Sequence, residues 1–166
     1  MRYVDGCLGC EIVAGRRDVP GGIVHQTTRW VVNHAVGRLS LGTLVVAPRD
    51  HVVAVADLDD GAAAELGPLL RDTARVVEAI CRPEQTYVCV WSHGLTERRH
   101  LHILVQPVTT ALVARYDGLR SEQLQARMLA TGEPPDPAEI ERFCADTRLR
   151  FAAEAARARD RSARRR

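Results

Sequence analysis

Two histidines in one short segment are the residues of this chain best suited to chemistry. From Arg99 to Pro107 polar and apolar side chains alternate, and this period of two is typical of a half-buried β-strand. The polar face would carry His100, His102, Leu104 and Gln106, and the apolar face Leu101, Ile103 and Val105. The apolar face predicts contact with a core. A single histidine on a strand is most often a satisfied or solvated residue, but two imidazoles side by side, roughly 6.6–7 Å apart at Cα, favour another explanation of the polar face.

A second chemical pattern opens the chain, where Cys7 and Cys10 form a Cys-x-x-Cys pair. The redox form of this pair needs a thiol at a helix N-terminus in a thioredoxin-like βαβ unit, which the order of elements here does not provide. The zinc-binding form needs two further ligands in a tetrahedral array. Sequence order leaves the choice open among the histidines, which are His25, His34, His51, His93, His100 and His102.

The elements that must position these residues follow an α+β order. Short strands are predicted at 23–26, 29–33 and 43–47 and again at 86–91, before the histidine strand. Between them, a helix is predicted over 62–81, with Asp59 and Asp60 as N-caps and one apolar face. That face comprises Leu66, Leu69, Leu70, Thr73, Val77 and Ile80. A meander, a long helix and a hairpin predict an antiparallel sheet with one helix packed on it.

The C-terminal part has a different composition and predicts helices. One helix is expected over 121–130, and Asp136 caps a second with an apolar face. That second face comprises Ile140, Phe143, Cys144, Thr147 and Phe151. We therefore expect a sheet domain over 1–110 and a C-terminal helical extension over 111–166, packed on the same domain. Six of the last ten residues are arginine, a basic tail that reads as a solvated helix end.

Composition narrows the class of protein further. With 166 residues and 46% hydrophobic content, the chain has the size and makeup of one soluble globular domain, and no apolar run approaches the ~20 residues of a membrane span. The N-terminus lacks a signal-peptide pattern. Five cysteines at irregular spacing predict reduced thiols, and together these features predict a cytoplasmic protein. A net charge of +2 argues against nucleic acid as the main partner.

In their order and spacing, these motifs resemble the histidine-triad (HIT) superfamily of nucleotidyl hydrolases and transferases. The resemblance runs from Cys7 to Pro107. It is carried by the cysteine pair, Asn33, the run Leu44-Val45-Val46-Ala47-Pro48-Arg49-Asp50-His51, the long helix and His100-Leu101-His102-Ile103. In zinc-bearing members the metal is held by the two cysteines, the histidine after the Pro-x-x segment and the first triad histidine. The resemblance thus implies one structural Zn²⁺ per chain on Cys7, Cys10, His51 and His100.

The resemblance also implies an activity. In the family the middle histidine, here His102, attacks the α-phosphorus of a nucleotide and forms a nucleotidyl-histidine intermediate. The expected function is cleavage or transfer of a nucleoside monophosphate, AMP above all, from a phosphoanhydride or a phosphoramidate, by a homodimer. Asn33 matches a position that commonly contacts the ribose. Developing phosphoryl charge needs donors or cations, for which the candidates are Ser92, Arg98, Arg99 and Gln106.

One departure from the family pattern keeps alternatives open. The third triad histidine corresponds to Leu104, which can neither contact phosphate nor assist a leaving group; Gln106 lies one same-face step later. A second interpretation is therefore a zinc-stabilised nucleotide-binding protein of the same fold without significant catalysis. A third interpretation is a basic, RNA-associated protein in which Cys7 and Cys10 form a small metal knuckle.

Overall fold

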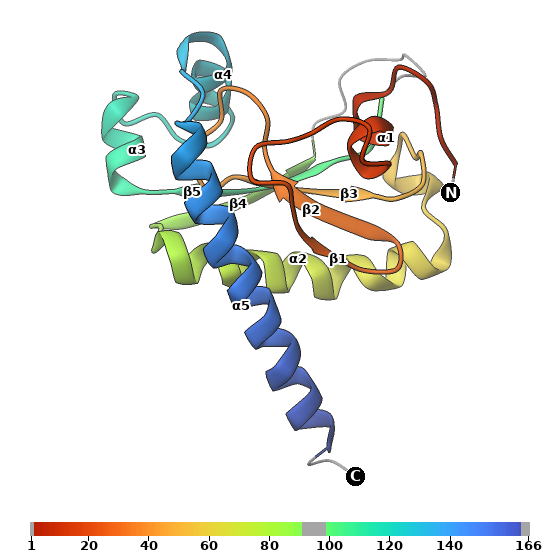
Figure 1. Ribbon diagram of the computed structural model, residues 1–166. Coiled ribbons are helices and arrows are strands. Elements are labelled where there is room, and N and C mark those ends of the chain that lie inside the picture. Colours follow the sequence, from red (N-terminus) through yellow and green to blue (C-terminus); the bar gives the residue numbers. More distant parts are fainter. Residues whose placement is uncertain (1, 91–98, 164–166) are drawn as a thin grey trace.

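The described part of the chain builds one five-stranded antiparallel sheet in which the early meander and the late hairpin meet. The structure is a computed structural model, and it describes residues 2–90 and 99–163. The strand order is β1-β2-β3-β5-β4, so β5 lies between β3 and β4 (Figure 1). The strands are β1 (Ile23–Gln26), β2 (Trp30–His34), β3 (Leu44–Pro48), β4 (Gln85–Val90) and β5 (Ile103–Val108). This architecture confirms the predicted α+β class.

Helices surround the sheet, and the helices predicted over 62–81 and 121–130 lie within two residues of the observed bounds. They are α1 (Leu8–Val13), the 3₁₀ turn η1 (Val55–Asp57), α2 (Asp60–Cys81), α3 (Thr110–Arg115), α4 (Ser121–Thr131) and α5 (Pro137–Ala163). The short α3 was not predicted, because six residues carry too little periodicity to detect. Helix α2 ends as predicted, where Arg82 adopts a left-handed conformation with φ of 45°.

The predicted histidine strand is shorter than expected at its N-terminal end. β5 begins at Ile103, so His100 and His102 lie in the segment that leads into the strand. This segment is nonetheless fixed, because the Leu101 amide donates a hydrogen bond to the Val52 carbonyl at 2.7 Å. The alternation of faces persists through it: Leu101 and Ile103 belong to the core on one side of the sheet, and Leu104 to the core on the other.

One face of the sheet is covered continuously by α2 and α5. Apolar side chains of the strands, of α2 and of α5 form a single buried core there. Its members include Val32, Val46, Ile103, Val105, Val76, Val77, Ile140, Phe143 and Phe151. The predicted apolar face of α5 is confirmed, since all five of its residues are buried. Helix α5 contacts both α2 and the edge strand β1, and it runs beyond the sheet toward the C-terminus (Figure 1).

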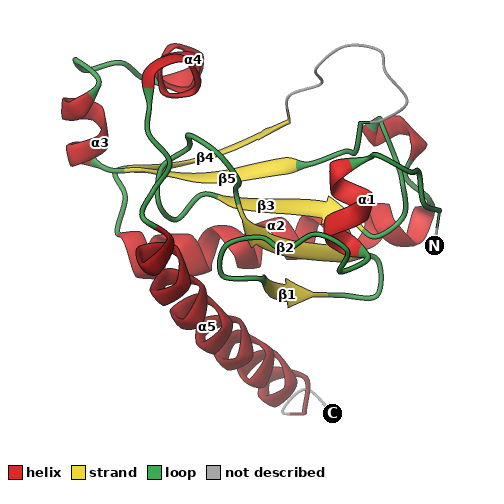
Figure 2. Ribbon diagram, turned by 45° about the horizontal axis from the view of Figure 1, so that its top comes forward, coloured by secondary structure: helices red, strands yellow, loops and turns green. Residues whose placement is uncertain are grey.

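The opposite face is covered at two separate ends. Figure 2 shows α1 over one end of the sheet and α3 and α4 beyond the other. A second apolar core joins this face to α3 and α4 and includes Leu104, Val113, Leu124 and Met128. The middle of this face has no helix of its own over it in the described chain.

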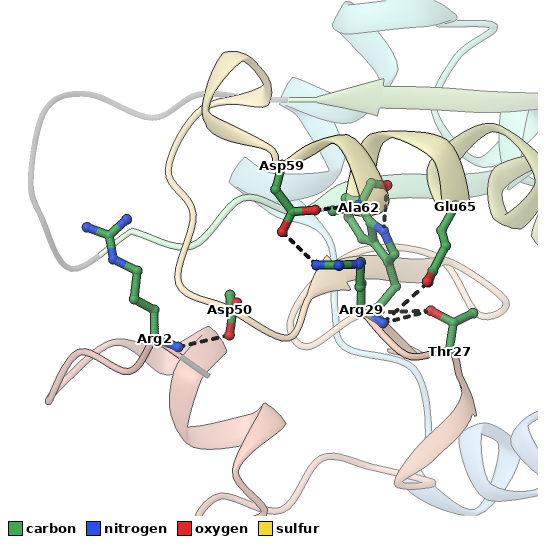
Figure 3. Close-up of polar contacts among 8 residues, drawn as sticks. Arg2, Thr27, Arg29, Asp50, Asp59, Ala62 and Glu65 are labelled. Carbon is green, nitrogen blue, oxygen red and sulfur yellow. Dashed lines mark hydrogen bonds and ion pairs between the residues drawn. The ribbon is translucent and has the colours of Figure 1, made fainter.

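The start of α2 is tied to the start of β2 by a group of polar contacts (Figure 3). Asp59 caps α2 by accepting a hydrogen bond from the Ala62 amide at 2.8 Å, and it also pairs with the Arg29 guanidinium at 2.6 Å. The Trp30 indole donates to the Ala62 carbonyl at 3.0 Å. These contacts fix the start of α2 against the sheet.

Among the described residues, no helix has the combined length and apolar character that crossing a bilayer requires.

Candidate functional site

Four side chains from three distant parts of the sequence converge beside α1. Cys7 precedes α1, Cys10 lies in it, His51 follows β3, and His100 precedes β5. Their ligand atoms, two thiol sulfurs and two imidazole nitrogens, all lie within 4.8 Å of one another. Both thiols and His51 are buried, and His100 is partly buried. The described structure therefore brings together all four residues that the family resemblance implied as metal ligands.

The spacing of these atoms fits a tetrahedral metal site. The Cys10 sulfur lies 3.3 Å from Nδ1 of His51 and 3.5 Å from Nδ1 of His100, and the Cys7 sulfur lies 3.6 Å from the same His100 nitrogen. In a zinc tetrahedron with bonds of about 2.3 Å to sulfur and 2.0–2.1 Å to nitrogen, sulfur and nitrogen ligands lie roughly 3.6 Å apart. One nitrogen lone pair cannot serve two thiols well, so a shared central ion explains the geometry better than hydrogen bonds do.

The orientation of His100 also suits a metal ligand. Its Nε2 donates a hydrogen bond to the Pro48 carbonyl at 2.7 Å, which leaves the lone pair on Nδ1, facing the two thiols. Burial lowers the pKa of His100, so its imidazole is neutral at neutral pH, as metal binding requires. Burial raises the pKa of the Cys10 thiol, so a metal ion that binds there must displace its proton.

The other histidine candidates in the described chain lie elsewhere. His25 stacks on Phe151 of α5, with ring centroids 4.2 Å apart. His34 is fully buried, donating from Nδ1 to the Ala35 carbonyl and accepting at Nε2 from the Gly42 amide. Both are thus explained by packing. His93 lies outside the described residues.

Gly9 is a residue of the site that sequence reasoning missed. It lies between the two cysteines, and a Cβ at this position would overlap the Cβ and the ring of His100. Only glycine lets α1 approach the histidine closely enough for both cysteines to reach it. The glycine inside the Cys-x-x-Cys pair was the available signal. The N-terminal segment adds a further restraint, because Asp50 accepts a hydrogen bond from the Arg2 amide at 2.8 Å (Figure 3). The His51 amide in turn donates to the Arg2 carbonyl at 2.9 Å.

His102 lies next to the cluster, and it bonds to the backbone through the other ring nitrogen than His100 does. Its Nδ1 donates a hydrogen bond to the backbone carbonyl of His100 at 3.0 Å. In a neutral imidazole this places the lone pair on Nε2, the nitrogen that is not bonded to the backbone. The residue lines a cavity and is partly exposed to it. His102 can therefore act as a nucleophile toward a molecule in that cavity.

The cavity lies on the incompletely covered face of the sheet, between α1 and α4. Its volume is about 540 Å³, within the range typical of small-molecule sites. Three of the predicted catalytic and substrate-binding residues line it, namely Asn33, Arg99 and His102, together with the metal-ligand candidate His100. The Asn33 amide donates to the His34 carbonyl at 2.8 Å, which leaves its side-chain oxygen as an acceptor. Ser92 and Arg98 lie outside the described residues, so their predicted roles are not examined by the structure.

Several solved structures share this architecture. A Zn-bound histidine triad family protein from Mycobacterium smegmatis matches 91% of this chain and 96% of its own, with a TM-score of 0.65 and 15% identity. A hypothetical histidine triad nucleotide-binding protein from Sulfolobus tokodaii matches 89% of this chain and 93% of its own (TM-score 0.66, 14% identity). A member of the HIT family from Bacillus subtilis matches 70% and 80%, respectively (TM-score 0.58, 19% identity). This chain has the histidine-triad fold.

The likeness to the histidine-triad fold extends past the sheet domain. A match to 91% of the chain requires more than residues 1–110, so C-terminal residues take part in it. At these identities the likeness is one of fold. No protein-family model matches the chain, and no significant match is found among curated proteins.

Three residues near the catalytic candidate His102 decide which groups the cavity offers: Leu104, Gln106 and Gln125. Leu104 lines the cavity on the same side as His102. Gln106 does not: it is fully buried, and its side chain bonds with Gln125, Ser40 and Met128. The prediction that Gln106 contacts a substrate is therefore not supported, because α4 covers that position on the strand.

Gln125 of α4 lines the cavity, whereas Gln106 does not. The Gln125 amide nitrogen donates to the side-chain oxygen of Gln106 at 2.8 Å and to the Cys89 sulfur at 3.1 Å. Sequence reasoning missed it, because a glutamine on an amphipathic helix is ordinarily a solvated residue. Only the packing of α4 against the sheet turns it inward.

Proposed function

We propose that this protein is a nucleotidyl hydrolase or transferase in which His102 attacks the α-phosphorus of a nucleotide. The observation that carries the proposal is the hydrogen bond from Nδ1 of His102 to the His100 carbonyl, which leaves the Nε2 lone pair for a molecule in the cavity. An imidazole fixed in one tautomer beside a cavity of this size is well suited to nucleophilic catalysis. The histidine-triad fold adds support, since one similar structure is described as a nucleotide-binding protein.

The proposed reaction has two steps. In the first, the Nε2 lone pair of His102 forms a bond to phosphorus, and the bond from phosphorus to the leaving group breaks. The leaving group departs with that electron pair and takes a proton from water, because Leu104 has none to give. In the second, a water oxygen bonds to phosphorus, the electron pair of the P–N bond returns to Nε2, and a water proton passes to solvent. An acceptor hydroxyl in place of water gives the transferase.

The cavity supplies groups for the nucleoside part. Leu8, Ile12 and Val13 of α1 form an apolar wall that suits a flat base, and adenine is the base we propose. The free oxygen of Asn33 can accept a hydrogen bond from a ribose hydroxyl. Arg99 also lines the cavity, and its guanidinium is the described cation that we assign to the phosphoryl oxygens.

The metal we propose for the cluster is zinc, one ion per chain. The donor set of two thiols and two imidazoles and the tetrahedral spacing fit this ion. When bound, zinc would supply a closed four-ligand structural site with no position for substrate. Residue 100 has two functions here: its Nδ1 faces the metal ligands, and its carbonyl accepts from His102. Fixing His100 therefore also fixes the orientation of His102.

We further propose a cytoplasmic homodimer. All five cysteines are free thiols, which suits a reducing compartment. Among the described residues no strand pairs with the outer side of the edge strand β4, which exposes Val88 and Val90 at 49% and 42%, so a second copy can extend the sheet there. Light scattering on the purified protein would give the mass of a dimer, and Val88→Lys would shift it toward the monomer.

The test of the proposed chemistry is intact-mass spectrometry of the protein quenched soon after mixing with AMP and GMP donors. Wild type should gain the mass of one nucleoside monophosphate, and His102→Ala treated identically should not. Absence of both an adduct and a released nucleotide with every donor, despite measurable nucleotide affinity, would contradict the proposal. That outcome would identify the chain as a nucleotide-binding protein without catalysis, which is the alternative raised by Leu104 at the position of the third triad histidine.

A further inference from the structure

Gln125 of α4 is a polar cavity residue that the proposed reaction does not use. It is only 4% exposed, and its amide nitrogen donates to the Gln106 side-chain oxygen at 2.8 Å and to the Cys89 sulfur at 3.1 Å. These two bonds engage both protons of the amide nitrogen. No described residue donates to the Gln125 carbonyl oxygen, and the side chain lines the cavity. To a molecule in the cavity, Gln125 can therefore offer only an acceptor.

The orientation of this amide is set by a sulfur atom on the other side of Gln106. The Gln106 amide nitrogen lies 3.3 Å from the Met128 sulfur and 3.4 Å from the Ser40 hydroxyl. A thioether sulfur has no proton and can only accept, so it keeps the nitrogen of Gln106 on its own side. The Gln106 oxygen must then face Gln125, which can bond to it only through nitrogen. Met128 thus determines that an oxygen, and not an N–H group, is left for the cavity.

Gln125 reaches the sheet at one end of a row of side chains that crosses four strands. The register gives this row across β2, β3, β5 and β4, namely Asn33, Val45, Leu104 and Cys89. The first three of these residues line the cavity, and Gln125 bonds to the last. Three strand spacings, roughly 14 Å at Cα, separate the two ends of the row. A ribose hydroxyl that bonds to Asn33 therefore leaves Gln125 to another part of the bound molecule.

The apolar surroundings of the Gln125 oxygen make a donor on the ligand important. Leu104 on the sheet and Leu129, one helical turn along α4, line the cavity with it. A ligand that fills the cavity removes water from this oxygen, and an acceptor that loses water without gaining a donor weakens binding. An N–H or O–H group on the ligand restores the hydrogen bond. A ligand oxygen without a proton would instead place two acceptors against each other.

We propose that Gln125 is a specificity-determining residue whose carbonyl oxygen accepts a hydrogen bond from an uncharged N–H or O–H group of the bound nucleotide. This proposal rests on the proposed binding of a nucleotide in the cavity, and not on the attack by His102. Two parts of a substrate can carry such a donor, namely the exocyclic amine of the base and the group attached to the phosphate. In either case the cavity selects a substrate with the donor over an analogue that lacks it.

Two matched pairs of probes distinguish these two sources. In the first pair, AMP is compared with purine riboside 5′-monophosphate, which lacks the exocyclic amine. In the second, the 2-hydroxyethyl ester of AMP is compared with the 2-methoxyethyl ester, which lacks the hydroxyl proton. Dissociation constants are measured by calorimetry in the His102→Ala background, where no nucleotidyl transfer to residue 102 takes place. In one pair the donor-bearing probe should bind at least about fivefold more tightly than its partner, and that pair identifies the source of the donor.

Variants of residue 125 assign this preference to its oxygen. Gln125→Met has a similar length but no strong acceptor, and the ratio of the two dissociation constants should fall to about one. Gln125→Glu keeps an acceptor oxygen and should keep the preference. Loss of the contact with Gln106 affects both probes of a pair alike, so the ratio reports the contact with the ligand. Gln123→Met is the matched control on α4, at an exposed position outside the cavity lining, and should leave the ratio unchanged.

A further variant tests the orientation of the amide without changing Gln125. Met128→Leu removes the sulfur that orients Gln106 and conserves the side-chain volume. Both amides can then turn over and present the Gln125 nitrogen to the cavity, so the ratio should fall at least about twofold.

The outcomes separate this proposal from the proposed catalysis. Equal binding within both pairs, or a preference that Gln125→Met leaves intact, would overturn the role of Gln125 while nucleotide binding stands. No affinity for any of the four probes would overturn both proposals. If the preference depends on Gln125 but the wild-type chain forms no adduct with any AMP donor, the proposed catalysis fails and the role of Gln125 in binding is retained.

Discussion

The metal-ligand cluster and the cavity are neighbours that differ in one respect: the cluster is closed, and the cavity is open. His100 and His102 lie two residues apart, yet each belongs to a different region. His100 gives its Nε2 proton to the Pro48 carbonyl and turns Nδ1 to the thiols, whereas His102 gives its Nδ1 proton to the His100 carbonyl and keeps Nε2 for the cavity. The backbone carbonyl that each ring bonds to decides which nitrogen remains reactive.

The largest effect expected from breaking this division is on catalysis. His102→Ala removes the proposed nucleophile, and the proposed AMP release should fall by on the order of 10³-fold or more. Because His102 contributes no ligand atom to the cluster, zinc content and unfolding temperature should be essentially unchanged. Steady-state rates and elemental analysis of the same preparations check both parts. Residual wild-type-like turnover would assign the nucleophile to another residue.

Breaking the closed region should instead reduce stability. Cys10→Ser removes a proposed zinc ligand whose sulfur contacts both imidazoles, and we expect loss of zinc and about 2–5 kcal/mol of unfolding free energy. Catalysis should fall as well, because His100 no longer holds its carbonyl against His102. Urea unfolding with and without a chelator measures the effect. Cys81→Ser is the control, since Cys81 lies in α2 outside the cluster and should retain full zinc.

A smaller change tests how closely α1 must approach His100. Gly9→Ala places a methyl group against the His100 ring and should lower stability by about 1–3 kcal/mol and weaken zinc binding. Gly67→Ala is the matched control, because a Cβ there meets nothing within 4 Å and alanine favours the α2 helix. Thermal unfolding and a competitive zinc titration report both quantities. Equal behaviour of the two variants would refute the close approach.

The smallest expected effect is a pH dependence of the unfolding free energy that comes from His34, on the α2-covered side of the sheet. Burial lowers the pKa of His34 below its unfolded value of about 6.5, so the unfolded chain binds more protons below that pH. The stability it contributes is therefore complete above about pH 6.5 and is lost as the pH falls through the lower folded pKa. Urea unfolding at pH 7.5 and 5.5 should show a larger loss with His34 than with His34→Gln. Both proteins are compared in the Cys10→Ser background, so that release of zinc at low pH does not contribute to the difference.

The sequence predicted the α2-covered side of the fold better than the cavity side. The apolar periodicities of α2 and α5 identified their buried faces, because side chains of a helix that face one continuous core recur about every 3.6 residues in the sequence. The four metal-ligand candidates came from the family resemblance, since spacing alone left six histidines open. Their convergence depends on chain segments far apart in sequence.

What the sequence could not predict depends on helix packing across the sheet. Gln106 was expected in the site from strand alternation, but α4 buries it and presents Gln125 in its place. No local pattern specifies which strand position a later helix will cover. The start of β5 at Ile103 depends on strand pairing instead, because β3 pairs with β5 only from that residue onward.

The most direct test of the division between the two histidines measures zinc content and adduct formation side by side in His100→Ala and His102→Ala. His102→Ala should retain one zinc per chain and form no nucleotidyl adduct with an AMP donor that labels the wild type. His100→Ala should lose zinc, while any residual adduct should still map to residue 102. A nucleotidyl adduct in His102→Ala, or full zinc occupancy in His100→Ala, would contradict it.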